Sequence, residues 1–404
     1  MVSEIVIGSA PTGAGFTLGG IARSDAQVAL TSGWTAEVLA GTQTIVARGP
    51  QASGYETARD AGLDAAQEAL DVFCIRGTLN LTIVRVEATH FAWWTDSAET
   101  IMRIVGVADH NVSLTATLSV VDAHGNPKPD PPLPVVWHRS FRYFRVSQMS
   151  TDLFDAYRNL YLALESILTT VVPIRQLSNG RSEPESIWLR RALRQIDATL
   201  PLARYAPPAS IDPPDDIYQD VYARTRTAIF HAKQGRTVFL PQHLGTTRAG
   251  VVDTLERLSR LYLDLVDKAL GVRRTGGGMT LGGFNLAMQS FINTTSEVAI
   301  SDDDSPLDPD DTAVNPGGGS VVQFAAAYDP DLDRSGCKYW LGELHSAQFG
   351  PVQRVSRLGL LHHSTLTQAG RLDDPVSLLG VDVLQIQLGH RLVNTNHPRA
   401  TFAT

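Results

Sequence analysis

The stretch LFDAYRNLYLALESIL, Leu153 to Leu168, marks the point where the chain changes from strand periodicity to helix periodicity. Its apolar residues recur at intervals of three and four, and the pattern continues to Val171, just before Pro173. This spacing predicts a long amphipathic helix, which Ser150 or Thr151 would cap at its N-terminus. The stretch therefore assigns the middle of the chain to a helical domain.

Three further helices are predicted after this one. Ser182 to Glu185 has the form of a capping box with a proline in the first turn, and the acidic run Asp212 to Asp216 is typical of a helix N-terminus. A fourth helix is expected from about Arg248 to Leu270, with Gly271 as its C-cap. Four amphipathic helices with moderate connections predict an antiparallel four-helix bundle over residues 149–274.

The flanking regions have a different composition. Residues 1–148 contain runs rich in β-branched and aromatic residues, the last being PVVWHRSFRYFRV, with one helix expected from Gly54 to Val72. We interpret this part as an N-terminal α+β domain. Residues 275–319 resemble a Gly/Asp-rich linker, and residues 320–404 a C-terminal β-rich region. The predicted fold class is therefore α+β multidomain.

Composition excludes several classes of protein. The 404 residues are 43% hydrophobic and 19% charged, which is typical of a globular protein and not of a disordered one. No apolar run reaches the roughly 18 residues of a membrane span. Cys74 and Cys337 lie far apart, so neither a disulfide framework nor a cysteine zinc site is expected. We expect a cytoplasmic protein with no metal and no cofactor.

The net charge of −8 is unevenly distributed. Residues 1–148 carry −4, residues 149–274 carry +3 and residues 275–404 carry −7. Only the middle region is basic, so an anionic partner is expected to bind there if it binds anywhere.

The stretch VYARTRTAIFHAK, Val221 to Lys233, carries the chemistry in this middle region. A histidine can take up or donate the proton when the 2′-hydroxyl of RNA attacks its own phosphate, and an arginine can hold that phosphate. At about 100° per residue, a straight helix pairs His231 with Arg224, whereas Arg226 lies about 140° away. The alternative is a solvated helix edge, since the helix dipole favours basic residues near a C-terminus.

Two stretches of the middle third resemble the HEPN superfamily, and most closely the MauJ-like and Apea-like bacterial members. LFDAYRNLYLALESIL resembles the first helix of the family, with Glu165 on an otherwise apolar face, and RTRTAIFHAK resembles its R-x4-6-H motif. The commonest register of that motif selects Arg226. The sequence departs from the family pattern at Thr225 and Thr227, where a polar Asn, Asp or His is often found.

The resemblance implies a metal-independent endoribonuclease, with a role in anti-phage defence or a toxin-like system. His231 would be the acid and base, Arg226 or Arg224 would hold the phosphate, and Lys233 and Tyr222 would contact the substrate. HEPN sites are usually composite, which implies RNA as a partner and a homodimer or higher homo-oligomer. The alternative is a non-catalytic structural or interaction protein that uses its bundle for oligomerisation or partner binding.

One other constellation contains histidines. His362 and His363 are adjacent at the end of an apolar run. Because adjacent side chains on a strand point to opposite faces, we expect a surface pair and not a metal site.

Overall fold

The computed structural model describes residues 5–8, 10–110, 113–114, 126, 136–150, 152–230, 239–242, 246–272, 277–278, 281–333 and 336–393. The chain forms two compact units. The sheet unit comprises Met1–His110 together with Thr280–Val393, and the helical unit comprises Asn111–Met279. The sequence analysis had divided the chain after residues 148, 274 and 319 instead.

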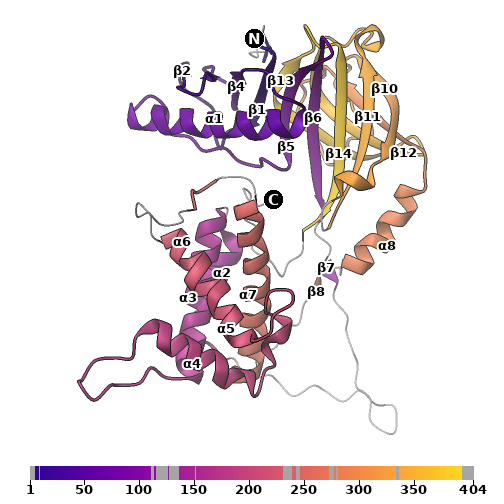
Figure 1. Ribbon diagram of the computed structural model, residues 1–404. Coiled ribbons are helices and arrows are strands. Elements are labelled where there is room, and N and C mark those ends of the chain that lie inside the picture. Colours follow the sequence, from indigo (N-terminus) through magenta and orange to yellow (C-terminus); the bar gives the residue numbers. More distant parts are fainter. Residues whose placement is uncertain are drawn as a thin grey trace. The chain divides into compact units, whose positions relative to one another are not determined.

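Twelve described strands of the sheet unit form one sheet, in the order β13-β12-β9-β10-β11-β14-β6-β5-β1-β4-β3-β2 (Figure 1). The strands are β1 (Thr12–Thr17), β2 (Ala26–Ala29), β3 (Thr35–Val38), β4 (Thr44–Gly49), β5 (Thr89–Asp96), β6 (Glu99–His110), β9 (Ser296–Ser301), β10 (Val321–Tyr328), β11 (Cys337–His345), β12 (Arg354–His362), β13 (Thr365–Ser377) and β14 (Val383–Leu392).

The pairing of β6 with β14 joins the two ends of the chain in this sheet. It is parallel, whereas every other pairing in this sheet is antiparallel, and it runs from Ile101 opposite Val383 to His110 opposite Leu392. The side chain of Arg103 donates two hydrogen bonds across it to Gln385, at 2.9 and 2.7 Å. The predicted fold class is therefore wrong, because the strands of residues 1–148 and 320–404 belong to one large sheet.

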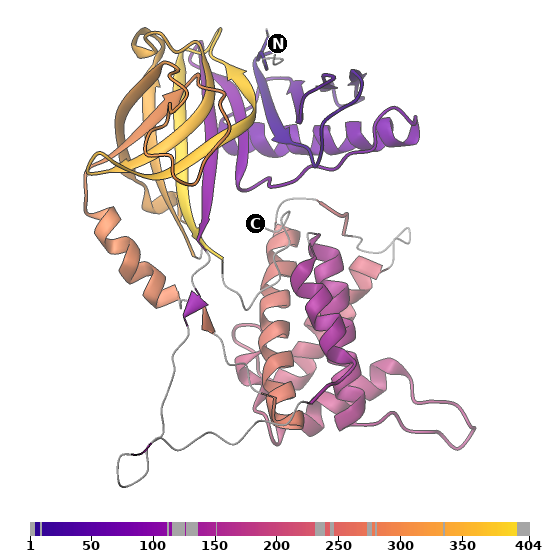
Figure 2. The same cartoon turned by 180° about the vertical axis from the view of Figure 1, so that it is seen from behind.

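The sheet curls so that β13 returns to the N-terminal strands (Figure 2). Asp374 on β13 accepts hydrogen bonds from the backbone N–H of Gln43 at 2.8 Å and from the Thr44 hydroxyl at 2.6 Å. Asp373 accepts one from the Thr17 hydroxyl at 3.0 Å. The curled sheet encloses a core to which both ends of the chain contribute, including Trp93 and Trp340.

Two helices belong to the sheet unit. Helix α1 (Tyr55–Ile75) lies across the N-terminal strands (Figure 1). It approaches β1 so closely at Gly62 that a Cβ there would lie 2.7 Å from the Cβ of Ala14. Helix α8 (Leu281–Ile292) precedes β9, so the predicted linker over residues 275–319 contains a helix and a strand. Short 3₁₀ helices, η3 (Pro330–Leu332) and η4 (Ser346–Gln348), flank β11.

The helical unit consists of helices of very different lengths. They are α2 (Ser140–Met149), α3 (Leu153–Val171), α4 (Glu185–Asp197), η1 (Leu202–Arg204), α5 (Pro213–Ile217), η2 (Tyr218–Arg226), α6 (Thr227–Phe230) and α7 (Thr246–Leu270), with a short β7–β8 pair (Ser113–Leu114 and Gly277–Gly278). The N-cap of α3 is Asp152 and not Ser150 or Thr151, since its carboxylate accepts from two backbone N–H groups of the first turn. Among the described residues, every helix is too short or too polar to cross a membrane.

Helix α2 was predicted as a strand, because its sequence is rich in aromatic residues. In the structure Phe141 and Phe144 pack against the core of the unit, and Arg142, Arg145 and Met149 face outward. Intervals of three and four between inward residues are helical periodicity and not the alternation of a strand. The hydroxyl of Ser147 also donates to a backbone carbonyl of α3 at 2.7 Å.

The predicted antiparallel four-helix bundle is also wrong. The additional helix α2 packs along α3, and the third predicted helix is divided into α5, η2 and α6. Segment η2 is a π-helix, in which backbone N–H groups bond to the carbonyl five residues earlier. Side-chain hydroxyls also donate to its carbonyls: Tyr157 donates to that of Val221 at 2.6 Å, and Thr227 donates to that of Tyr222 at 3.0 Å.

The parallel junction leads to a test of the fold. We expect residues 1–148 alone to aggregate or remain unfolded. Without β14, strand β6 would expose a long unpaired edge, and the sheet unit would lose about half of its core. A fusion of residues 1–110 to 280–404 through a flexible Gly/Ser linker is expected to unfold cooperatively in a thermal melt followed by circular dichroism. A monomeric, cooperatively folded 1–148 fragment would contradict this arrangement.

Candidate functional site

The candidate site is a cluster around Arg226, which we call the Arg226 cluster. Arg226 is the last residue of η2, and Tyr222 lies four residues before it. Helix α3 contributes Tyr161, and the first turn of α4 contributes Glu185. Phe230 of α6, which follows η2 directly, also lies against the guanidinium, so three segments that are distant in sequence meet there.

Glu185 is the acceptor at the centre of the cluster. Its Oε1 accepts a hydrogen bond from the Tyr161 hydroxyl at 2.7 Å. Its Oε2 accepts from Arg226 Nη2 at 3.1 Å and from the Tyr222 hydroxyl at 3.4 Å. A carboxylate in the first turn is also favoured by the helix dipole. Glu185 therefore fixes the position of the guanidinium and of two phenol rings.

Aromatic rings surround the rest of the Arg226 guanidinium. Its central carbon lies 4.9 Å from the ring centre of Tyr222, 5.4 Å from that of Phe230 and 5.7 Å from that of Tyr161. These distances are in the range of cation–π attraction. The side chain is 21% exposed, and its buried Nε has no hydrogen-bond partner among the described residues. An unpaired buried donor is costly, so a charged group in this position calls for an explanation.

The stacking continues beyond the cluster in both directions. The rings of Tyr218 and Tyr222 stack with their centres 5.2 Å apart, and Arg190 lies 4.0 Å from the Tyr218 ring centre. At the other end, Arg158 lies 5.3 Å from the ring centre of Phe230. Along η2, Tyr218, Tyr222 and Arg226 are each four residues apart. This spacing places them on one side of a π-helix, which has more residues per turn than an α-helix.

Burial and neighbouring charges shift pKa values in and beside the Arg226 cluster. Burial raises the pKa of Glu165, and the negative charge of Glu185 raises it further, although Arg226 opposes both effects. Burial also raises the pKa of Tyr161 and Tyr222. The tyrosines therefore remain neutral donors at neutral pH, and Arg226 is the cation of the cluster.

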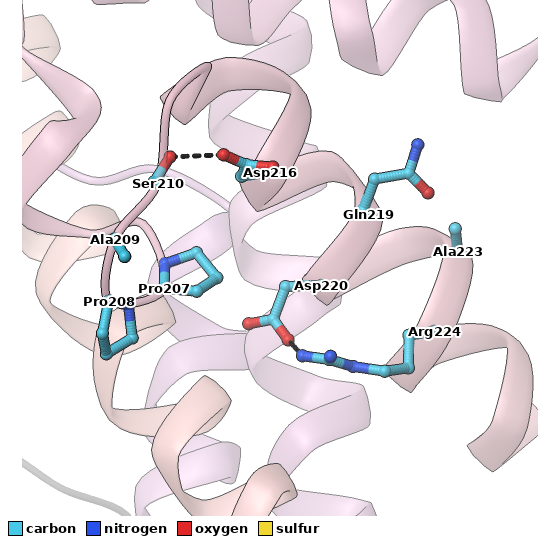
Figure 3. Close-up of a pocket in the computed structure, with 9 residues that line it drawn as sticks. All are labelled: Pro207, Pro208, Ala209, Ser210, Asp216, Gln219, Asp220, Ala223 and Arg224. Atoms are coloured by element: carbon cyan, nitrogen blue, oxygen red, sulfur yellow. Dashed lines mark hydrogen bonds and ion pairs between the residues drawn. The ribbon is translucent and has the colours of Figure 1, made fainter.

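Arg224 lies in a different environment. It is 63% exposed and forms an ion pair with Asp220, which is 3% exposed. Asp220 also accepts from Arg257 at 2.6 Å and from the Thr254 hydroxyl at 3.0 Å. Arg224 and Asp220 line a pocket of about 570 Å³, together with Pro207, Pro208, Ala209, Ser210, Asp216, Gln219 and Ala223 (Figure 3).

The carboxylates of this pocket already have partners. Asp216 accepts from the Ser210 hydroxyl at 2.5 Å and from the backbone N–H groups of Ile211 and Asp212 at 3.2 and 3.3 Å. The Ser210 hydrogen bond is the main cause of the lowered pKa of Asp216. These bonds hold the loop before α5 in place, so the pocket offers no free carboxylate to a ligand.

The structure separates the residues that the sequence had grouped. Tyr222 and Arg226 are in contact, whereas Arg224 binds Asp220 instead. His231 and Lys233 lie outside the described residues. The expected alignment of Arg224 with His231 assumed a straight α-helix, and that assumption fails because residues 218–226 form a π-helix.

Sequence reasoning missed Glu185 and Tyr161 as site residues. The predicted capping box does not form: the N-cap of α4 is Pro184, and no side chain caps the helix. Glu183 instead binds Arg191, with its two oxygens 3.0 and 2.7 Å from the guanidinium nitrogens. The only signal was that Glu185 is the acidic residue of the predicted capping box, a pattern that assigned it to the helix N-terminus and not to a site.

Glu185 provides a test of the cluster. We expect Glu185→Ala to lower the free energy of unfolding of the helical unit by about 1–3 kcal/mol, because the Tyr161 hydroxyl loses its acceptor. Glu185→Gln keeps an acceptor and should cost less. The matched control is Glu256→Ala, which removes an exposed carboxylate from an ion pair on α7. It should stay within about 0.5 kcal/mol in urea unfolding, and an equal loss in both alanine variants would contradict this role of Glu185.

A second polar cluster, the histidine cluster, lies inside the sheet unit. His362 and His390 are 4% and 2% exposed, and their ring centres are 6.1 Å apart. His390 Nδ1 shares a hydrogen bond of 2.7 Å with His110 Nε2. His362 Nδ1 shares one of 2.9 Å with the Ser296 hydroxyl. The expectation that His362 lies on the surface is therefore wrong, since it points into the curled sheet.

The histidine cluster lies against an apolar side chain. The ring of Trp340 lies 5.0 Å from that of His362 and 5.5 Å from that of His390. Among the described residues, His362 Nε2 and His390 Nε2 have no hydrogen-bond partner, and no group of three or more metal-binding side chains is placed to hold an ion. Burial lowers the pKa of His390 to about 3 and that of His362 to about 4. Both rings are therefore neutral at neutral pH.

A comparison of the chain with known protein-family models, curated proteins and solved structures returned no match.

Proposed function

We propose that this protein is a metal-independent endoribonuclease of the HEPN type, in which Arg226 holds the scissile phosphate. The observation that supports this best is the fixed guanidinium of Arg226. Glu185 and three aromatic rings hold it in place five residues before His231, at the spacing of the R-x4-H motif.

The proposed reaction needs only side chains. The 2′-oxygen attacks the adjacent phosphorus as His231 removes its proton, and the bond from phosphorus to the 5′-oxygen breaks. The leaving oxygen takes a proton from the protonated His231 of the partner subunit in a homodimer. The products are a 2′,3′-cyclic phosphate and a 5′-hydroxyl. Arg226 offsets the negative charge that builds up on the phosphate in the transition state.

Arg226 is a better phosphate ligand than Arg224 for two reasons. Its guanidinium is oriented before substrate binds, so little freedom is lost on binding. A guanidinium has five N–H donors, and Glu185 accepts from only one of its nitrogens in the structure. Arg224 is instead exposed and paired with a buried carboxylate, from which a phosphate would have to displace it.

The proposal includes a biological setting. RNA is the substrate, the protein acts in the cytoplasm as a homodimer or higher homo-oligomer, and its role is in anti-phage defence or a toxin-like system. Tyr222 would contact the substrate through its position beside Arg226, and Lys233 would contact a neighbouring phosphate.

The experiment that tests this function is cleavage of total RNA by the purified protein in EDTA. We expect cleavage by the wild type, with cyclic phosphate ends on the products, and none by His231→Ala. Wild-type cleavage that depends on added divalent metal would overturn the proposal, as would equal cleavage by both proteins.

One observation favours a second candidate, a non-catalytic interaction protein. The charge of Arg226 is already balanced by Glu185, so the Arg226 cluster also has a purely structural value. In that case Arg226→Ala lowers stability without any RNA cleavage to lose. A wild type that forms dimers but never cuts RNA, together with a destabilised Arg226→Ala variant, would support this second function.

A further inference from the structure

The outward side of α2 carries aromatic and basic residues next to each other, and we call it the α2 outer face. It consists of Arg142, Tyr143, Arg145, Val146 and Met149 of the helix, together with Trp137, which precedes the first turn of α2 by three residues. Trp137 is 68% exposed and Tyr143 is 40% exposed. Exposed aromatic side chains beside basic ones form a candidate binding surface.

The opposite side of α2 holds this helix firmly in the helical unit. The ring of Phe144 stacks on that of Tyr262, with centres 4.7 Å apart. The buried Ser140 hydroxyl shares a hydrogen bond of 3.0 Å with the Tyr262 hydroxyl. The outer face is therefore presented on a fixed helix, and its own side chains are not needed for packing.

The charge of the α2 outer face is positive and uncompensated. Between Asp130 and Asp152 the sequence contains no acidic residue. Arg142 and Arg145 form no ion pair with any carboxylate that the structure describes. Residues three apart lie on the same side of a helix, so the two guanidinium groups form one basic strip beside the aromatic rings.

We propose that the α2 outer face binds single-stranded RNA. Bases stack on Trp137 and Tyr143, and the phosphates between them bind Arg142 and Arg145. Alternating aromatic and basic groups are the arrangement by which proteins hold single strands without sequence preference. The proposal rests on the proposed ribonuclease function and deepens it, since it names the surface that holds the strand.

Other occupants fit this face less well. The bases of a duplex are stacked on each other and cannot lie on Trp137 or Tyr143. A lipid surface requires a wider apolar side than Val146 and Met149 provide. A second copy of the chain would place the same arginines opposite each other across a two-fold axis, which is unfavourable.

The test is equilibrium binding of a 2′-O-methyl oligouridylate, which lacks the attacking hydroxyl and cannot be cut. We expect Trp137→Ala combined with Tyr143→Ala to weaken binding by about tenfold or more. We expect Arg142→Ala combined with Arg145→Ala to lower the slope of log affinity against log salt by about 1.4, which is about 0.7 for each lost phosphate contact. Circular dichroism melts should match the wild type, since all four side chains are exposed.

Matched controls come from other helices of the same unit. Arg194→Ala combined with Arg260→Ala removes two arginines that are 63% and 56% exposed, and Ile187→Ala removes an apolar side chain that is 57% exposed. These variants should keep the wild-type affinity and salt slope. An equal loss in the control arginine pair would overturn the assignment to α2.

The outcomes separate this inference from the proposed function. Binding that depends on Trp137 and Tyr143, in a wild type that does not cut RNA, supports the α2 outer face and overturns the ribonuclease. RNA cleavage by a wild type whose oligonucleotide affinity is unchanged in both α2 variants does the reverse. No binding by the wild type also overturns the inference. The inference is also overturned if the α2 variants keep their RNA affinity but lose binding to anionic vesicles, or if they keep it but no longer dimerise.

Discussion

Arg226→Ala is expected to lower the rate of RNA cleavage by about 10²–10³-fold, which is the usual effect of removing one preorganised donor to a developing anion. The side chain is 21% exposed and contacts Glu185 and three aromatic rings, so its removal also lowers stability, and circular dichroism must show that the variant is folded at the assay temperature. The loss should appear in the rate of product formation at saturating RNA, because Arg226 stabilises the transition state more than it strengthens substrate binding.

Comparison variants isolate the role of the Arg226 guanidinium. Arg226→Lys keeps the charge but loses the planar fork, so we expect an intermediate rate. Arg224→Ala is the matched control, since it removes the other arginine of the motif from an exposed position. It should retain a rate within about threefold of the wild type, as surface substitutions have small effects. A greater loss in Arg224→Ala than in Arg226→Ala would reverse the assignment.

The sheet unit is expected to lose stability when the pH falls from 7 to 5. An unfolded histidine binds its proton near pH 6.5, whereas burial lowers the pKa of His390 to about 3, of His362 to about 4 and of His90 to about 3. Below pH 6.5 the unfolded chain therefore binds more protons, so the free energy of unfolding falls until the folded pKa values are reached. Each histidine costs about 2 kcal/mol between pH 7 and pH 5.

Urea unfolding at the two pH values, followed by tryptophan fluorescence, measures this loss. The total for three histidines, about 6 kcal/mol, is comparable with the whole stability of many domains. His362→Gln combined with His390→Gln should reduce the loss of stability between pH 7 and pH 5 by about 4 kcal/mol. The exposed neighbour His363 provides the control variant, His363→Gln. Equal pH dependence in the double variant and the wild type would contradict this role of the histidine cluster.

Local sequence patterns predicted the helices that depend on local interactions. The periodicity of α3 and α7 is visible in the sequence, and Asp212 caps α5 as its position suggested, accepting from a backbone N–H three residues later. Helix α1 was expected from Gly54 to Val72 and is found from Tyr55 to Ile75. In these segments the propensity of each residue and its burial favour the same structure.

The features that were missed depend on distant partners. The parallel pairing of β6 with β14 joins residues 282 positions apart, and no local pattern specifies which strand lies next to β6. Helix α2 has the composition of a strand, and it is helical because Phe141 and Phe144 find a core on one side. In the site, the motif indicated Arg226 and Tyr222, but Glu185 reaches them only after α4 has packed against η2.

Along the chain, the helical unit is inserted between β6 and β14, and this order has a consequence for synthesis on the ribosome. At about 5–20 residues per second, the 282 residues between paired positions take about 14–56 s to translate. During this interval β6 has been made and its partner has not, so its polar edge and apolar face are open to other chains. Nascent chains should therefore depend on chaperones, and slower translation of residues 111–279 should increase aggregation in the cell even though the finished protein is unchanged.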